Sequence, residues 1–261
     1  KRGARGGDVR RGSIAGRNEV SEVSAGVGMP TPIPGRHTVL LSSVVFCLAS
    51  TLLLLQFIGL TLDDAWPLDA INGLGAASCV CWFVGFALLI EWLVFRSFAA
   101  YGPSRRALVG AALKLIASVL FCVQPFSGLA HPHADPLETA TLAKFNFVGI
   151  AFFHAGNCID AVGMAPLLDR RRWLSHANAP VYGMFVYCAA TWLLIAADGM
   201  VYYAVERPTL ISIGQIAGAS LLLCGSLVYT GRAAGSMRRL GSAELGSCAS
   251  AGRAWRLRTA R

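Results

Sequence analysis

The sequence predicts an all-α fold, namely a polytopic membrane protein whose six transmembrane helices pair into three helical hairpins. Three observations lead to this prediction. The chain is 55% hydrophobic and only 14% charged, whereas soluble domains are about a quarter charged. Apolar runs of about 20 residues recur, which is the length that a helix needs to cross the core of a bilayer. Finally, the basic residues gather in alternate connectors, as they do in multi-pass membrane proteins.

The predicted transmembrane domain covers residues 38–231 and consists of hairpins 38–95, 106–163 and 178–231. The six spans are residues 38–60, 71–95, 106–126, 141–163, 178–203 and 209–231.

The three hairpins differ in polarity. In the first hairpin, an outgoing run from Phe46 and a returning run that ends at Glu91 are almost wholly apolar. The second hairpin carries Lys114 in its first span, and its second span is the most polar of the six. The third hairpin is again apolar, apart from Asp198 near the end of its first span.

Both tails are basic. Residues 1–37 are rich in Arg, Gly and Ser and poor in acidic residues, so we expect either a disordered tail or the remnant of an organelle targeting segment. Residues 232–261 form a second basic tail, in which Trp255 lies among arginines. That mixture suits either a surface of anionic lipid headgroups or a solvated tail.

The charge distribution predicts the topology. The two tails and the connectors 96–106 and 164–177 hold 20 of the 23 Lys and Arg residues. The charged residues of the other connectors are mostly acidic: Asp63, Asp64, Asp69, Asp135, Glu138 and Glu206. By the positive-inside rule, both termini face the cytoplasm, matrix or stroma, and an organellar inner or thylakoid membrane is one candidate location. The net charge of +9 does not indicate nucleic-acid binding, because no folded soluble domain presents a basic face.

An internal repeat supports the division into hairpins. Ser50, Ser118 and Thr191 occupy matching places in the odd spans, at intervals of 68 and 73 residues. The even spans place Gly85, Gly156 and Ala219 at comparable depth. Small residues spaced seven apart keep one helix stripe against one neighbour and let backbones approach closely. The predicted packing glycines are Gly85, Gly149, Gly156, Gly163, Gly214 and Gly218.

The first hairpin contains three short segments with a distinctive pattern: Phe46–Leu53, Asn72-Gly73 and Phe83–Leu89. Through these segments it resembles the YrhK-like domain of small bacterial membrane proteins. With looser matches in the other hairpins, the resemblance implies three tandem membrane hairpins over about residues 40–230. It implies no catalytic residues, and the fourth span departs from the pattern at His154.

Ionisable residues inside the spans are candidate sites, because a charge in hydrocarbon is costly unless it is paired or reaches the interface. Glu91 and Lys114 lie at similar depth on consecutive helices, so we expect an ion pair, or else two side chains that reach the interface separately. Asp160 is a competing partner for Lys114. A second pair is expected between Lys144 and Asp198, near the opposite end of the helices.

The fourth span has a polar face. At 100° per residue, Asn146, Asn157 and Asp160 share one side of the helix with Gly149 and Gly156, and His154 lies at its edge. This face must look toward protein or water. It is either a ligand, pigment or proton site, or a glycine-packed face with hydrogen bonds between helices.

Few cofactors fit the sequence, and none is required by it. His154 is the one histidine well inside a span, so it could bind a haem or chlorophyll as a single axial ligand but could not form a bis-histidine site. His131, His133 and Asp135 could touch a metal from their connector, although the polarity of a turn explains them equally. Seven of the eight cysteines lie in apolar runs, where they act as small packing residues.

Three functional hypotheses follow. The first is a non-catalytic accessory or structural subunit that packs against other membrane proteins and lipid in a larger complex. The second is a carrier of small solutes or ions that uses the polar face of the fourth span together with Glu91, Lys114 and Asp198. The third is a pigment- or haem-binding protein centred on His154. No sequence motif of a catalytic site supports an enzyme.

Overall fold

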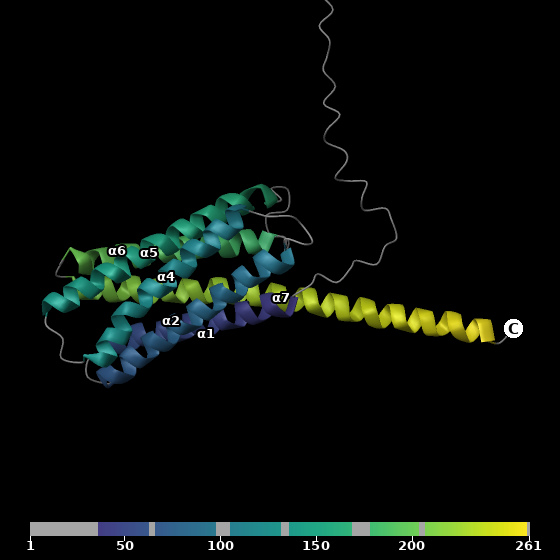
Figure 1. The fold of residues 1–261 in the computed structure, drawn as a ribbon, viewed down its shortest axis with the longest axis horizontal. Helices are drawn as coiled ribbons and strands as arrows, with labels where there is room; N and C mark the ends of the chain where they lie inside the picture. Colours follow the sequence, from purple (N-terminus) through teal and green to yellow (C-terminus); the bar gives the residue numbers. More distant parts are fainter. Residues whose placement is uncertain are drawn as a thin grey trace, which may run out of the picture. The chain divides into compact units, whose positions relative to one another are not determined.

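The computed structural model describes residues 36–62, 66–97, 105–131, 136–168, 178–203 and 207–259. Within these ranges the chain forms six long helices and no strand (Figure 1). They are α1 (Arg36–Thr61), α2 (Leu68–Glu91), α4 (Arg105–Ala130), α5 (Pro136–Met164), α6 (Ala179–Tyr202) and α7 (Pro208–Thr259). All six are long and apolar enough to span a membrane. The predicted all-α, six-helix membrane protein is therefore confirmed.

Prolines determine where several helices begin. Pro136 and Pro208 are the first residues of α5 and α7, and Pro180 lies in the first turn of α6. Proline is suited to this position because its fixed φ matches the helix and its missing N–H would have no partner there. At its C-terminal end, α2 is extended by a π-helical turn (Trp92–Ser97).

The helices form a closed ring. Each hairpin packs internally through the pairs α1–α2, α4–α5 and α6–α7. Contacts between α2 and α4, between α5 and α6, and between α7 and α1 join the hairpins. Neighbouring helices are antiparallel, so α1, α4 and α6 begin at one end of the ring. We call this the basic end, because Arg105 and Arg106 lie there, and we call the opposite end the far end.

The three hairpins repeat one another residue by residue. Phe46, Lys114 and Tyr187 each lie four residues before the predicted repeat position and cover a glycine of the partner helix. A Cβ atom added to Gly85 would lie 2.3 Å from Phe46, and one added to Gly225 would lie 2.7 Å from Tyr187. The third copy therefore uses Gly225, and the predicted match of Ala219 with Gly85 and Gly156 was wrong by six residues.

Five of the six predicted packing glycines do lie in contact with a neighbouring helix. Gly163 does not, because a Cβ added there would meet nothing within 4 Å. Gly156 lies opposite Gly110 of α4. Seven residues further along, Gly163 lies past the start of α4 at Arg105, so the described part of the chain offers it no partner.

The last helix is longer than predicted. The sequence places the end of the transmembrane domain at residue 231, but α7 continues without a break to Thr259 and runs past the other helices (Figure 1). The basic C-terminal segment is therefore helical, and the apolar part of α7 ends at Gly235. The N-terminal tail (residues 1–35), most acidic connector residues and the pair His133 and Asp135 lie outside the described residues.

Candidate functional site: a central cavity

A cavity of about 110 Å³ lies between the helices. Every helix of the ring contributes to its wall, so it lies on the axis about which the hairpins are arranged. Most of the wall is apolar. The lining residues are Leu53, Gln56, Phe57, Leu60, Ser78, Cys79, Trp82, Phe121, Gln124, Pro125, Asn146, Ile150, Phe153, Leu194, Gln215 and Leu222.

Four carboxamide side chains line this cavity. Gln56 and Gln124 occupy the same position in the first and second hairpins, six residues after the repeat serine. Asn146 and Gln215 are also equivalent to each other, ten residues before Gly156 and Gly225. The matching residue in the first hairpin is Gly75, against which the Gln56 side chain packs. We call these four residues the amide girdle.

Asp198 anchors the amide girdle. It is buried, and its two carboxylate oxygens accept hydrogen bonds from Asn146 Nδ2 and from Gln215 Nε2, the latter at 3.1 Å. The expected ion pair between Asp198 and Lys144 is not formed, and Lys144 is exposed. Since Asn146 faces α6, Lys144 two residues earlier points to the other side of α5.

Pro125 interrupts the wall of the cavity within α4. A proline has no N–H to donate to the carbonyl four residues earlier, which here belongs to Phe121. Phe121 and Pro125 both line the cavity. This stretch of α4 thus brings backbone with weakened helical hydrogen bonding to the site, as is common where transmembrane helices border a functional space.

An aromatic cluster closes the cavity toward the basic end. Trp82 and Phe153 lie edge to face with ring centroids 5.3 Å apart, and Phe153 makes similar contacts with Phe86 and Phe121. Phe46 adds a fifth ring, 4.7 Å from that of Phe86. These rings belong to four helices, so their packing holds the first and second hairpins together.

A chain of three hydroxyl groups links the third hairpin to the first. The Tyr187 hydroxyl lies 2.5 Å from Ser226 Oγ, which lies 3.2 Å from Ser50 Oγ. All three residues are buried, and they link α6, α7 and α1. Ser50 is one of the predicted repeat positions, so its burial explains why a small hydroxyl residue recurs there.

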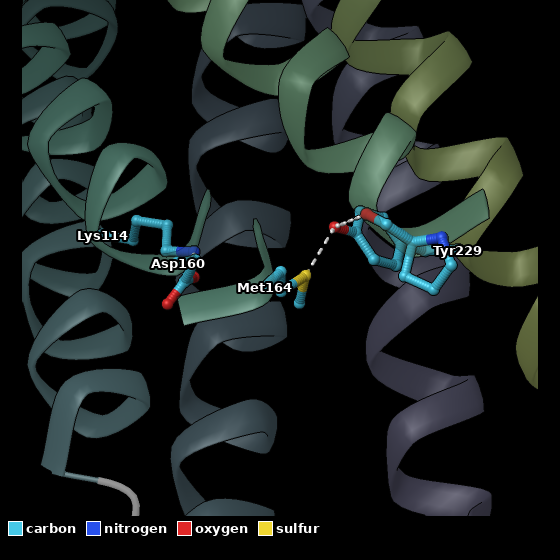
Figure 2. A network of polar contacts seen from close by, with 5 residues as sticks. Lys114, Asp160, Met164 and Tyr229 are labelled. Atoms are coloured by element: carbon cyan, nitrogen blue, oxygen red, sulfur yellow. Dashed lines mark hydrogen bonds and ion pairs between the residues drawn. The ribbon is translucent and has the colours of Figure 1, made fainter. Parts of the chain in front are cut away.

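The intramembrane lysine is paired with Asp160, the competing partner named above (Figure 2). Lys114 is only 4% exposed, and its ammonium group lies in contact with the Asp160 carboxylate. The ammonium group also lies 5.8 Å from the centre of the Phe86 ring. Glu91, the other predicted partner, is the half-buried last residue of α2.

This ion pair occupies a position that is apolar or aromatic in the other hairpins. The residues equivalent to Lys114 and Asp160 are Phe46 and Leu89 in the first hairpin. In the third they are Tyr187 and Tyr229, whose rings lie 5.8 Å apart. Tyr229 also donates a hydrogen bond of 3.1 Å to the carbonyl of Pro180 and approaches Met164 Sδ at 4.0 Å, as Figure 2 shows. The ion pair thus occupies the position of a contact that holds the two helices of each hairpin together near the basic end.

His154 lies outside the cavity and is bonded at both ring nitrogens. Nδ1 lies 2.7 Å from Thr191 Oγ1, and Nε2 lies 3.3 Å from Cys158 Sγ. The ring also packs edge-on against Trp192. A haem or chlorophyll bound through this histidine would have to displace one of these partners. Among the described residues, no group of three or more His, Cys, Asp or Glu could hold a metal ion.

Asn157 is the least satisfied polar residue of the predicted face. Its side chain is 1% exposed, and Nδ2 has no hydrogen-bond partner among the described residues. It does not line the cavity, and its neighbour Gly156 packs against the α4 backbone. The polar face of the fourth span is therefore divided. Asn146 borders the cavity, whereas Asn157 is buried and Asp160 is half-buried between helices.

Sequence reasoning missed Gln215 as a residue of the site. The missing signal was the register of the third hairpin, since aligning Gly225 with Gly156 places Gln215 opposite Asn146. Comparison of the chain with known protein families, with characterised proteins and with solved structures gives no match. The resemblance to YrhK-like hairpins therefore stays a prediction that depends on the sequence segments quoted above.

Proposed function

We propose that this integral membrane protein is a carrier of small solutes, and that the central cavity is its binding site. One observation carries the proposal: a cavity on the axis of a closed helical ring, with wall residues from all six helices. An accessory subunit needs exposed contact surfaces but no space at its centre. A carrier needs a central site that every hairpin can reshape when it moves.

The cavity suits a small, uncharged solute that both donates and accepts hydrogen bonds. Its volume of about 110 Å³ is somewhat below that of an engineered cavity of about 150 Å³ that binds benzene in another protein. Carboxamides supply donors and acceptors together, and the aromatic rings supply an apolar wall. Asp198 holds two of the four amides in place, so we assign it a positioning role.

Movement of the hairpins about the ring axis would give access from either side. In the described conformation the aromatic cluster and the Lys114–Asp160 pair close the basic end. The hairpins meet at three similar seams, so tilting each hairpin could open that end while closing the other. This differs from the paired inverted repeats of many carriers, but the central position of the site is the same.

The direct test is solute flux into proteoliposomes, followed by light scattering after mixing with urea, acetamide or glycerol. We expect faster entry of at least one of these solutes than into protein-free liposomes. Gln124→Leu should slow that entry roughly tenfold, because a buried hydrogen-bonding group lost from a desolvated site costs about 1–3 kcal/mol.

The matched control is Val119→Leu, an outward-facing substitution on the same helix, which should leave flux unchanged. Equal rates with and without protein for all three solutes would refute the carrier proposal. Stable co-purification with other membrane proteins in mild detergent, combined with such a result, would favour the accessory-subunit hypothesis.

We also propose that the basic end faces the cytoplasm, matrix or stroma, on the charge pattern of the connectors. In a bacterial expression host, a green fluorescent protein fused after Arg261 should then fluoresce, and alkaline phosphatase at the same place should be inactive. Replacing Arg105 and Arg106 by Gln should weaken this preference, whereas Arg207→Gln should strengthen it. An active phosphatase fusion of the unaltered chain would show that the orientation is reversed.

A further inference from the structure

A second hollow lies on the outside of the ring. It is a groove of about 450 Å³ between the start of α4 and the end of α5, at the basic end. Its lining residues are Arg105, Arg106, Val109, Cys158, Ile159 and Val162. Val109 is 50% exposed and Val162 is 64% exposed. Because the outer surface of a membrane-spanning ring faces lipid, lipid chains must cover these apolar side chains.

The groove combines an apolar wall with a basic end. Val109, Ile159 and Val162 form the wall, and Arg105 and Arg106 are exposed at the first turn of α4. The first turn of a helix has unpaired N–H groups and the positive end of the helix dipole. Arginine binds phosphate oxygens through two parallel N–H groups, which makes this end suited to a phosphate.

Within the described part of the chain, the lining of this end carries no opposing charge. None of the six described lining residues is acidic. Asp160 follows Ile159 directly in the sequence, but its carboxylate binds the buried Lys114. The buried ion pair therefore removes the nearest carboxylate on α5 from competition for the two arginines.

The arginine pair is peculiar to the second hairpin. By the repeat register, the residues equivalent to Arg105 are His37 in α1 and Asn178 before α6. Those equivalent to Arg106 are Thr38 and Ala179. Among the described residues, α1 begins with one arginine, Arg36, and α6 begins with Ala179, so two adjacent arginines open an odd helix in the second hairpin alone.

We propose that this groove binds an anionic phospholipid, with its phosphate on Arg105 and Arg106 and one acyl chain along Val109, Ile159 and Val162. The apolar length of the groove favours a lipid over a free anion, because inorganic phosphate would leave that surface unused. Basic pockets between transmembrane helices are suited to anionic headgroups. This site stands apart from the central cavity and does not depend on the proposed transport.

The test measures lipid binding to the whole chain in neutral detergent, by native mass spectrometry and by thermal unfolding. Phosphatidylglycerol should bind roughly tenfold or more tightly than phosphatidylcholine and should raise the unfolding temperature, since two basic contacts distinguish the headgroups. The double variant Arg105→Gln, Arg106→Gln should lose this preference. Arg232→Gln, which removes one positive charge at an exposed residue of α7 near the same end, should keep it.

Val109→Trp provides an independent test, because it fills the apolar part of the groove and leaves the charge unchanged. It should weaken phosphatidylglycerol binding, whereas inorganic phosphate at equal concentration should not compete. Full preference for phosphatidylglycerol in the double arginine variant would overturn the proposal. Competition by inorganic phosphate, together with unchanged binding in Val109→Trp, would also overturn it and would assign the arginines to a free phosphate ion.

Discussion

Replacing Asp160 with Leu is expected to destabilise the protein strongly, and adding Lys114→Phe is expected to restore most of the loss. Asp160→Leu leaves the Lys114 ammonium group buried without its carboxylate. Removing one partner of a buried ion pair costs about 3–5 kcal/mol in soluble proteins. The double variant recreates the Phe46 and Leu89 arrangement of the first hairpin, and apolar replacement of a buried pair is often neutral or better.

The measurement is the free energy of unfolding in mixed micelles for the wild type, both single variants and the double variant. The double-mutant cycle isolates the coupling between the two side chains. Lys144→Phe makes the same change at an exposed lysine and should shift stability by no more than about 0.5 kcal/mol. If Asp160→Leu were no less stable than the double variant, the pair would not hold α4 to α5.

Gln56 and Gln124 of the amide girdle are expected to be far more tolerant of such changes than the ion pair. Gln56 and Gln124 are half-buried beside a cavity, so their loss exposes no uncompensated charge. Stability and transport should therefore respond to different residues. A large effect of Gln124→Leu on flux with a small effect on unfolding would separate the binding site from the fastening contacts.

The ring could be predicted in outline because a bilayer restricts the choices. Length and hydropathy specify the spans, and the alternation of basic and acidic connectors specifies the hairpins. The repeat identified Ser50, Ser118 and Thr191 correctly, and all three are fully buried. Each follows by four residues the side chain that covers a glycine of the partner helix, so their sequence spacing carries the structural information.

The pairing of charges could not be predicted, because sequence fixes depth in the membrane but not direction around the ring. Lys114 lies on a helix that contacts both α2 and α5, so Glu91 and Asp160 were equal candidates by depth. The rotation of α4 decides between them by placing Lys114 against Gly156. The same limitation explains Lys144, which has the right depth for Asp198 but faces away from α6.

The cavity was unpredictable for a different reason. Its wall consists of side chains from six helices. Its volume depends on how these side chains pack together, which the sequence does not reveal. The sequence suggested a site between His154 and Asp160, where the repeat is most disturbed. The structure instead fills that region by close glycine packing and an ion pair, and leaves the space nearer the far end.

Gly156→Ala and Gly163→Ala are expected to change the stability of the protein in opposite directions, although the two glycines lie seven residues apart on one stripe of α5. A Cβ atom at Gly156 would lie 2.7 Å from the backbone carbonyl of Gly110 and 2.8 Å from Lys114 Cγ. A backbone carbonyl cannot avoid the clash by changing rotamer as a side chain can, so α4 and α5 must move apart. Such overpacking typically costs about 1–3 kcal/mol, and here it would also strain the Lys114–Asp160 pair.

A Cβ atom at Gly163 meets nothing within 4 Å, and alanine favours a helix over glycine by up to about 1 kcal/mol. Gly163→Ala should therefore be neutral or slightly stabilising. Thermal unfolding of both variants in one detergent gives the comparison, with the two curves expected on opposite sides of the wild type or nearly so. Equal shifts would mean that the stripe packs along its whole length and that α5 has a partner beyond Arg105. A larger loss at Gly156 would show that close backbone approach is confined to where α4 and α5 overlap, which is where the buried charge must be enclosed.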